Sequence, residues 1–417
     1  MHRSPALSQS ASLAARRVGA AQSQRNPQWL GYRCLRCEQR YDLGDLPEGC
    51  PACARAGVPA SVVARYANDP ADAADASNLP TQARWPQLPY QQPWSLGEGH
   101  TPCVAVPALA AALGLARVSI KNESANPTGS HKDRMSAMGI THALQQGAHT
   151  VVLASSGNAA ISAAAYCAAA GLACEVAAYS TLADPFARGL AAFGAQVLSF
   201  DTPFARWDHV RQRAQSPGVF ALTNYMVPPV GSAAVAVEAY KAIAWECVDA
   251  GVVPDHVLVP TARGDLLWGI WAGFEHARAA GRIARTPRVW AIEPFARLSR
   301  VLSGEPLSKS FEGSTAQFSI AGETVTYQQW HAVQRSEGGA VVVDDALACA
   351  AQRSLGAHGF WPELCAAAPL AAMQILLHEG RIQPSEHALL IMTARADRDN
   401  AAPSFRAPSS SLERNSA

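Results

Sequence analysis

The sequence predicts an α/β fold whose parallel sheets are covered by helices on both faces. Beyond residue 100, short apolar and β-branched runs alternate with longer segments of helical periodicity. A run such as TVVLAS (150–155) has no polar alternation, which is typical of a strand buried on both sides. The chain has 417 residues, long for one core, and enough such runs for two doubly wound domains.

The predicted elements follow in chain order. The runs expected to be strands are RVSIK (117–121), TVVLAS (150–155), EVAAYS (175–180), AQVLSF (195–200), HVLVP (256–260), RVWAIE (288–293) and ALLIM (388–392). The segments expected to be helical include 133–147, 159–171, 232–251 and 266–281. Ligands of open α/β sheets bind at the carboxyl ends of the strands, so the turns that follow these runs are the candidate sites.

Composition excludes several classes of function. A net charge of +1 gives no field for nucleic acid or an anionic membrane. The longest apolar runs are broken well before the roughly 20 residues of a membrane span. Residues 1–28 contain no acid and no continuous apolar stretch, so we expect a disordered tail of a cytoplasmic protein, with a transit peptide as the alternative. Residues 401–417 are also of low complexity and are predicted to be disordered.

Four of the ten cysteines form a metal-ligand pattern. CLRC (34–37) and CPAC (50–53) are two C-x2-C pairs separated by twelve residues. Four thiolates in such pairs suit a tetrahedral, structural Zn²⁺ site, with a small β-ribbon between them. Two disulfides or four inert thiols are the rival interpretation, and without a secretory signal disulfides are disfavoured. The predicted ligands are Cys34, Cys37, Cys50 and Cys53.

The stretch NPTGSHKDR (126–134) places a lysine in a turn that opens a helix. Lys132 is one of only four lysines, and Ser130 followed by Asp133 is a weak capping-box signal. In the first helical turn, the positive end of the helix dipole favours a neutral amine. A neutral amine is what carbonyl chemistry needs. Taken alone, an ordinary surface lysine is the simpler interpretation.

Other turns after strands carry groups that bind anions. SSGNAA (155–160) follows a strand and opens a helix, where backbone N–H groups and the helix dipole point at a ligand. A plain tight turn is an equal alternative. Two strands end in Thr-Ala-Arg, giving Thr261 with Arg263 and Thr393 with Arg395. Either guanidinium could clamp a phosphate or carboxylate, or be a solvated loop arginine.

Together and in this order, these motifs resemble the pyridoxal-phosphate enzymes of fold type II, and within them the threonine synthases. The motifs are GEGHTP (97–102), KNESANPTGSHKDR, ASSGNAA, VEAYKAIAWE, VPTARGDLLWGI, GFWPELCAAAPLAAM and IMTARADRD. The resemblance covers roughly residues 90–400. Many threonine synthases also carry a cysteine-rich ribbon before the catalytic core.

The resemblance implies roles for individual residues. Lys132 would be the Schiff-base lysine and general base, and Asn158 would hydrogen-bond the ring hydroxyl of pyridoxal phosphate. Thr393 would face the pyridine nitrogen, leaving a weaker electron sink that suits elimination and replacement. The loop that would hold the cofactor phosphate consists of Thr261, Ala262, Arg263, Gly264 and Asp265.

The substrate side of the site is implied in the same way. The group that would hold the substrate carboxylate is Ser155, Ser156 and Gly157. In threonine synthases, the phosphate of O-phosphohomoserine leaves and water adds at the β-carbon. Arg134, close in sequence to Lys132, is the expected partner of the departing phosphate. The substrate is a small amino acid, and a homodimer is possible for this class.

Departures from the family pattern leave the substrate open. His131 precedes the lysine, and Ala262 and Arg263 stand where the phosphate loop is usually richer in glycine. Cys365 stands beside Glu363 where a serine is common. A β-replacement or dehydration on a serine- or threonine-type substrate, as in cysteate synthase or threonine dehydratase, is therefore the alternative activity. A binding protein without catalysis is a further alternative.

The expected domain organisation combines these features. A zinc ribbon at 29–65 is followed by a linker at 66–89. Segments 90–127 and 236–400 are expected to build a larger α/β domain, and 128–235 a smaller one inserted between them. The cofactor would lie in the cleft between the two.

Overall fold

The computed structural model describes residues 23–67 and 88–399. Most of the predicted tails and linker therefore lie outside the described residues. Residues 23–28 were expected to belong to the disordered tail, but here they pack on the protein. The buried Asn26 donates a side-chain hydrogen bond to the carbonyl of Leu88 at 3.0 Å, and Arg25 pairs with Tyr90 in a β-bridge.

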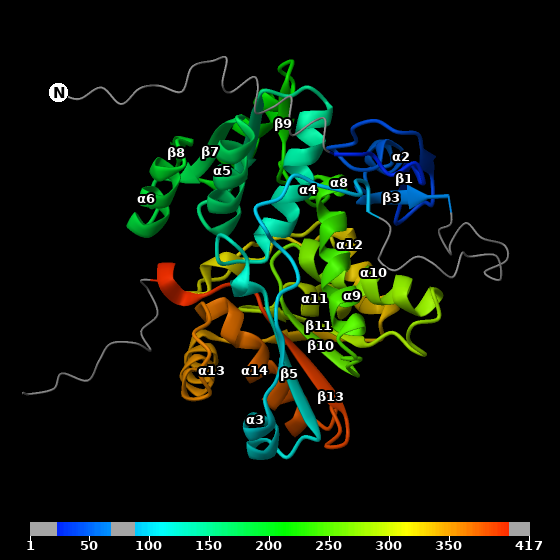
Figure 1. The fold of residues 1–417 in the computed structure, drawn as a ribbon, viewed down its shortest axis with the longest axis vertical. Coiled ribbons are helices and arrows are strands. Elements are labelled where there is room, and N and C mark those ends of the chain that lie inside the picture. Colours follow the sequence, from blue (N-terminus) through cyan, green and yellow to red (C-terminus); the bar gives the residue numbers. More distant parts are fainter. Residues whose placement is uncertain (1–22, 68–87, 400–417) are drawn as a thin grey trace, which may run out of the picture.

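The small central sheet is parallel throughout, with the order β8-β7-β6-β9. It occupies the upper part of the molecule in Figure 1. Its elements are α4 (Lys132–Gln145), β6 (Thr150–Ala154), α5 (Asn158–Ala170), β7 (Ala173–Tyr179), α6 (Asp184–Ala192), β8 (Gln196–Phe200), α7 (Pro203–Ala214) and β9 (Val219–Ala221).

The large sheet has the order β12-β11-β10-β13-β5-β4. Its strands run parallel except β4, which pairs antiparallel with β5, so this sheet is mixed where only parallel strands were expected. Its first elements are β4 (Cys103–Ala105), α3 (Pro107–Ala112), β5 (Arg117–Asn122) and the 3-10 turn η2 (Glu123–Ala125). The later ones are β10 (His256–Pro260), α10 (Asp265–Ala279), β11 (Arg288–Glu293), α11 (Leu298–Leu302), η4 (Phe318–Ile320), α12 (Tyr327–Arg335), β12 (Gly339–Val342), α13 (Asp345–Ala357), α14 (Leu364–His378), β13 (His387–Met392) and η5 (Ala396–Arg398).

The inner strands of both sheets are buried on both faces, as their uniformly apolar sequences predict, whereas the edge strands β8 and β4 are partly exposed. In β6, Val151 and Leu153 belong to one hydrophobic cluster, whereas Val152 belongs to a second cluster with Trp207 of α7. Successive side chains of a strand point to opposite faces, so both faces are covered. The α/β class is confirmed, and all the runs predicted to be strands are strands.

The N-terminal cysteine-rich unit is a three-stranded antiparallel sheet of order β2-β1-β3 with one short helix. Its elements are β1 (Trp29–Cys34), β2 (Arg40–Tyr41), α2 (Pro51–Arg55) and β3 (Val62–Tyr66). The unit packs beside α4 and α8 (Ala234–Val237). The buried Glu238 accepts hydrogen bonds from the backbone N–H of Ala64 and the hydroxyl of Tyr66, which ties this unit to the residues that follow α8.

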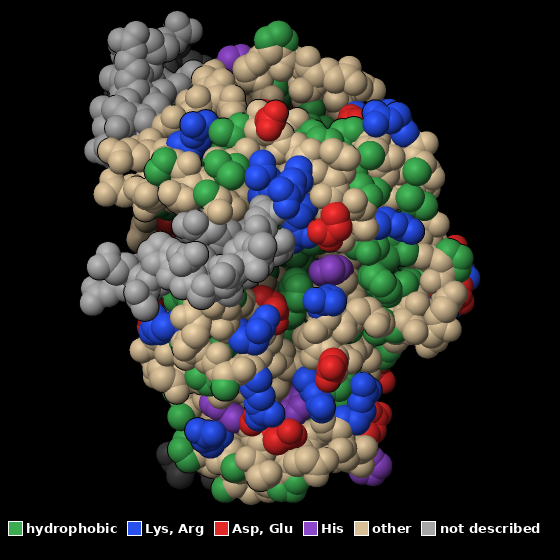
Figure 2. All heavy atoms as spheres, turned by 90° about the vertical axis from the view of Figure 1, so that its right-hand side faces the viewer, with side chains coloured by type: hydrophobic (Ala, Val, Ile, Leu, Met, Phe, Trp, Pro, Cys, Tyr) green, Lys and Arg blue, Asp and Glu red, His purple; other side chains and the backbone are tan. Residues whose placement is uncertain are grey.

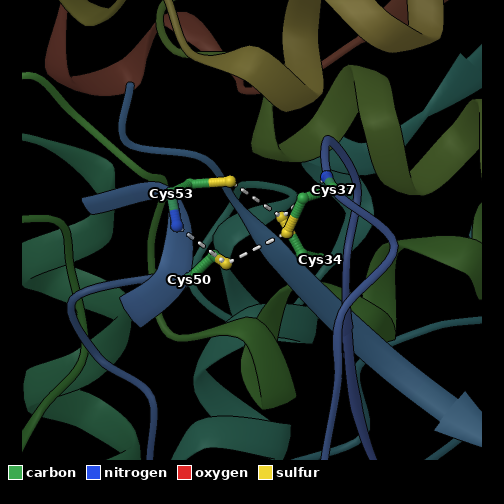
Figure 3. A group of neighbouring side chains, drawn as sticks. All are labelled: Cys34, Cys37, Cys50 and Cys53. Atoms are coloured by element: carbon green, nitrogen blue, oxygen red, sulfur yellow. Dashed lines mark hydrogen bonds between the residues drawn. The ribbon is translucent and has the colours of Figure 1, made fainter. Parts of the chain in front are cut away.

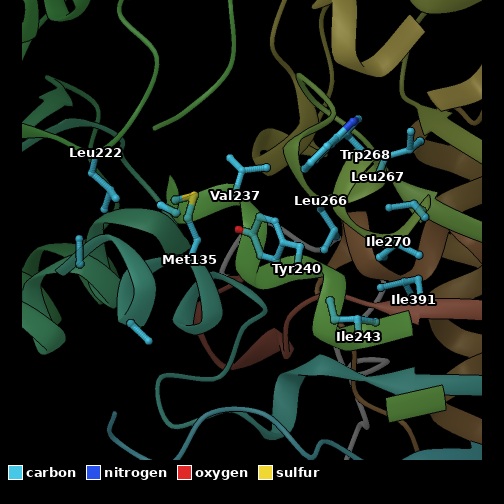
Figure 4. Close-up of a cluster of buried hydrophobic side chains, with 14 of the residues drawn as sticks. Met135, Leu222, Val237, Tyr240, Ile243, Leu266, Leu267, Trp268, Ile270 and Ile391 are labelled. Carbon is cyan, nitrogen blue, oxygen red and sulfur yellow. The ribbon is translucent and has the colours of Figure 1, made fainter. Parts of the chain in front are cut away.

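The segment 232–251 was predicted to be one helix but is interrupted. It consists of α8, the 3-10 turn η3 (Glu238–Tyr240) and α9 (Lys241–Asp249). α10 packs closely against this part of the segment, since a Cβ at Gly273 would clash with the carbonyl oxygen of Lys241. Figure 4 shows Tyr240 in the middle of the resulting cluster, with Met135 on one side and Leu266 on the other.

A buried network of four charges fixes the start of α4. Arg134 donates from Nε to Glu123 at 2.7 Å and from Nη1 to Glu246 at 2.6 Å. Lys121 donates to the same Glu246 at 2.5 Å. All four side chains are at most 6% exposed. Burial alone would raise the pKa of Glu123, but the charge and hydrogen bonds of Arg134 outweigh it and lower the pKa to about 2. Two cations and two anions thus compensate one another.

The surface agrees with the near-zero net charge. On the face drawn in Figure 2, basic and acidic side chains are interspersed over the part that is not grey. Among the described residues, no helix combines the length and the apolar character that crossing a membrane requires.

We expect Arg134→Met to lower the free energy of unfolding by about 3–5 kcal/mol, because it leaves buried carboxylates without a partner. The measurement is urea unfolding at neutral pH. Arg300→Met is the control, since Arg300 and its partner Glu305 are 47% and 30% exposed and such a pair contributes at most about 1 kcal/mol. Equal losses in the two variants would contradict the role of the buried network.

Candidate active site

One cavity of about 310 Å³ lies where the ends of both sheets meet. Three helices begin at its wall: α4 at Lys132, α5 at Asn158 and α10 at Asp265. Each follows the carboxyl end of a strand or the turn after it, where α/β proteins place their ligands. The cavity therefore collects three helix N-termini, whose free N–H groups and dipoles favour anions.

Lys132 lines this cavity, as predicted. Burial is the main cause that lowers the pKa of its amine. The charge of Arg263 lowers it further, while Asp265 and Glu363 act in the opposite direction. Removal of water is thus the chief cause of the lowered pKa, whereas the sequence suggests the helix dipole as its cause.

The predicted capping box is wrong in detail. The residue before α4 is His131, and its side chain makes no capping bond. Asp133 instead accepts hydrogen bonds from the backbone N–H of Thr128, at 2.6 Å, and from its hydroxyl, at 2.5 Å. The carboxylate therefore closes the turn before the lysine, because Thr128 offers it two donors at once.

His131 packs on the ring of Tyr240, with 5.6 Å between ring centroids, and lines the cavity. Burial, aided by the charge of Lys132, lowers the pKa of His131 to about 3. The imidazole is therefore neutral at physiological pH. Its Nδ1 lies 3.3 Å from the carbonyl oxygen of Thr393, so the histidine joins the lysine turn to the end of β13.

Asn158 is the first residue of α5 and is 8% exposed. Its Nδ2 donates to Oε2 of Glu363 at 2.6 Å, and its Oδ1 accepts from Nη1 of Arg398 at 3.1 Å. Ser155, Ser156 and Gly157 line the cavity beside it. Ser156 accepts a hydrogen bond from the backbone N–H of Tyr179 at 2.7 Å, which holds this loop to the end of β7.

The loop from Thr261 to Asp265 also lines the cavity. Gly264 has φ +82°, a conformation that side chains disfavour, and a Cβ there would clash with Gln329. Asp265 accepts hydrogen bonds from the backbone N–H and the hydroxyl of Ser232, which also lines the cavity. Thr393 lines the cavity at the end of β13.

Two arginines give the cavity a cationic wall. Arg206 of α7 is 8% exposed, and its Cζ lies 3.5 Å from the ring centroid of Tyr179. Its Nε is buried and has no hydrogen-bond partner. The Cζ of Arg263 lies 5.4 Å from the ring centroid of Trp207. Among the residues that the structure describes, no carboxylate forms an ion pair with either guanidinium. Burial lowers the pKa of both groups, yet arginine keeps its charge in proteins.

Arg134 does not line the cavity, so its expected role toward a departing phosphate is corrected. Its guanidinium is committed to Glu123 and Glu246. Side chains two positions apart on a helix project about 200° apart, so Arg134 points away when Lys132 points inward. Arg395 is also absent from the lining, and it pairs with Asp397 at 3.1 Å.

Sequence reasoning missed Arg206, Tyr179 and the segment 318–324, all of which line the cavity. Arg206 lies within FARWD, one of many arginine-bearing stretches, and nothing in its local pattern marks it. Glu363 was noted only for its neighbour Cys365, although its carboxylate contacts Asn158 directly. These residues reach the cavity from four separate places in the chain: the end of β7, α7, the segment before α12 and the start of α14.

The four N-terminal cysteines come together as predicted (Figure 3). Cys34 and Cys53 have sulfurs 3.7 Å apart, and Cys37 and Cys50 have sulfurs 3.6 Å apart. A tetrahedron with Zn–S bonds of ~2.3 Å has edges of about 3.8 Å, whereas a disulfide requires about 2.05 Å. All four thiols are free, and the donor set fits a closed tetrahedral site.

Comparison with known proteins finds a matching family and several similar enzymes. Residues 94–394 match the family of pyridoxal-phosphate dependent enzymes. Threonine synthase of Methanocaldococcus jannaschii is 28% identical over 391 residues, covering 88% of this chain and 92% of that one. Threonine synthase of Synechocystis is 32% identical over 288 residues, covering 67% and 72%.

Solved structures support the fold. Threonine deaminase isoform 2 of Solanum lycopersicum is similar with a TM-score of 0.61 and 18% identity, covering 71% of this chain and 79% of that one. An L-serine ammonia-lyase of Rhizomucor miehei gives a TM-score of 0.62 and 19% identity, covering 73% and 96%. With the cavity built around Lys132 and the match over most of its length, this chain belongs to the pyridoxal-phosphate dependent enzymes of fold type II, with threonine synthases among its relatives.

Proposed function

We propose that this protein is a lyase of the threonine synthase type, which removes phosphate from O-phosphohomoserine or a related amino acid and adds water at the β-carbon. The observation that carries the proposal is the pair of guanidiniums in the cavity that contains Lys132: Arg206 is buried, Arg263 is half-buried, and among the described residues neither forms an ion pair with a carboxylate. Buried charge without an ion-pair partner is costly, so a cavity lined by two such cations is suited to an anionic ligand.

The residues present fit pyridoxal phosphate. The N-terminus of α10 with the tight turn at Gly264 suits its phosphate, and Asn158 suits its ring hydroxyl. Thr393 would face the ring nitrogen, and Lys132 would hold the aldehyde carbon. When bound, the cofactor withdraws electrons from the α-carbon of an amino acid and so makes its proton removable.

The chain's own groups would then divide the work. The N–H groups of the 155–157 loop would bind the substrate carboxylate at the start of α5. The neutral amine of Lys132 would take the α-proton. As the β-carbon loses a proton, the bond between the γ-carbon and the phosphate oxygen would break: the electron pair of the C–H bond forms a double bond between the β- and γ-carbons, and inorganic phosphate leaves with the electron pair of the C–O bond. A proton would then be added at the γ-carbon and the hydroxyl of a water molecule at the β-carbon, and return of the α-proton gives threonine and phosphate. Arg206 and Arg263 would bind the leaving phosphate.

We expect borohydride reduction followed by peptide mapping to find the cofactor attached at Lys132. Lys132→Arg should lower turnover by at least about 100-fold, because a charged guanidinium cannot act as the base. Lys309→Arg is the matched control, since Lys309 is 43% exposed and pairs with Glu305 on the surface. Label at another lysine, or full turnover of Lys132→Arg, would contradict this assignment.

We expect Arg206→Met and Arg263→Met each to lower kcat/KM for O-phosphohomoserine by about 10- to 100-fold, the worth of a charge-assisted hydrogen bond. The measurement is release of inorganic phosphate. Arg211→Met, on the same helix but 50% exposed and paired with Asp208, should leave kcat/KM unchanged. Unchanged kinetics in the Arg206 and Arg263 variants would remove these residues from the substrate site.

The alternative activity is a β-replacement or dehydration on a serine- or threonine-type substrate. Incubation with O-phosphohomoserine, phosphoserine, serine and threonine distinguishes the two. Release of phosphate with formation of threonine supports the first proposal. Formation of a 2-oxo acid from serine or threonine, without phosphate release from O-phosphohomoserine, replaces it by the alternative. Failure of the purified protein to become coloured with pyridoxal phosphate would favour a non-catalytic binding protein.

For the cysteine-rich unit we propose a structural zinc ion. We expect about one zinc per chain by atomic emission, and Cys53→Ser to lose it, because a hydroxyl is a poor substitute for a thiolate. Cys349→Ser, outside the cluster, should keep the metal. Zinc that persists in Cys53→Ser, or is absent from the parent protein, would contradict the assignment.

A further inference from the structure

The side-chain amide of Asn158 has two ends with opposite hydrogen-bonding character. Its Nδ2 donates and its Oδ1 accepts, and a 180° rotation exchanges them with little change of shape. A cofactor oxygen in the cavity can use only the end that donates. Something in the protein must therefore determine which end of the amide faces the cavity.

Glu363 alone does not determine it. Its Oε2 lies 2.6 Å from Nδ2 of Asn158, and its Oε1 accepts from the hydroxyl of Ser319. Burial raises the pKa of this carboxyl, against the hydrogen bonds that lower it. A protonated carboxyl has a donor as well as an acceptor, so it can satisfy either end of an amide.

Arg398 is different because a guanidinium only donates and does not lose its proton in proteins. Its Nη1 lies 3.1 Å from Oδ1 of Asn158, and its other terminal nitrogen, Nη2, donates to the carbonyl of Thr128 in the lysine turn. Its Cζ lies 6.0 Å from the ring centroid of Phe186. An inverted amide would bring the N–H₂ of Asn158 against the N–H groups of Arg398.

We propose that Arg398 is a positioning residue that orients the amide of Asn158 with its N–H₂ group toward the cofactor ring. It does not line the cavity, so it acts through Asn158 and not on a substrate. One hydrogen of Nδ2 serves Glu363, and the second is free for the ring oxygen. The same guanidinium joins the turn η5, the lysine turn and the start of α5. The inference rests on the proposed contact of Asn158 with the cofactor but on no particular substrate.

The test is a titration of the cofactor-free protein with pyridoxal phosphate, followed by the visible absorption of the bound cofactor. We expect Arg398→Gln to weaken cofactor binding about tenfold, the equivalent of one hydrogen bond, because glutamine can present either a donor or an acceptor to Asn158. Arg398→Lys, which still only donates, should stay within about threefold of the parent protein. Because no substrate is used, the result does not depend on the reaction.

A double-mutant cycle separates positioning from a merely structural role. In an Asn158→Ala background, Arg398→Gln should weaken binding by less than about twofold, because the amide it orients is gone. Arg395→Gln is the control, since Arg395 carries the same charge on the same turn but is 46% exposed and pairs with Asp397. A tenfold loss that persists without Asn158, or normal binding in Arg398→Gln, would overturn the proposal.

Discussion

The position of Lys132 depends on an ion network that its amine does not join. Lys132 begins α4, and two residues later Arg134 is held by Glu123 and Glu246 in the protein interior. Glu123 directly follows β5, and Glu246 belongs to α9, so the network relates the first turn of α4 to the large sheet and its covering helices. Because buried charges tolerate little displacement from their partners, this turn has one place in the fold.

The charged groups inside the cavity are arranged differently from those of the buried network. Around Arg134, acids and bases balance, whereas Arg206 and Arg263 have aromatic rings for neighbours in place of carboxylates. An aromatic face compensates a cation only in part. The two guanidiniums therefore lack an ion-pair partner among the described residues, although Asp265, Glu323 and Glu363 also line the cavity, and burial lowers the pKa of the Lys132 amine. The interior network serves stability, and the two unpaired guanidiniums are available for a ligand.

Local patterns were sufficient to predict much of this arrangement. Lys132, Asn158, Gly264 and Thr393 each follow a recognisable strand and occupy a turn, so their meeting at one edge follows from parallel topology. The cysteine cluster was predictable because its spacing encodes its geometry. Arg134 was misassigned because closeness in sequence was taken for closeness in space, although a helix turns neighbours in different directions.

Other residues could not have been predicted in this way. Arg206 reaches the cavity only because α7 covers one face of the small sheet, and no local signal distinguishes it from solvated arginines. Arg398 acquires its contact with Asn158 across 240 residues of sequence. The interruption of 232–251 has no local signal either, since its apolar pattern favours an unbroken helix.

The order of strands in the large sheet also bears on how the chain reaches this state. β5, near residue 120, has β4 on one side and β13, ending at Met392, on the other. Its central pairing is with a strand more than 250 residues later in the chain, as the register of Ile120 with Leu390 shows. Such non-local pairing forms slowly, because the entropy cost of closing a long loop comes before the stabilising contacts between the strands can form. During synthesis on the ribosome, the small parallel sheet can form first, while β5 of the large sheet must wait for β13 to emerge.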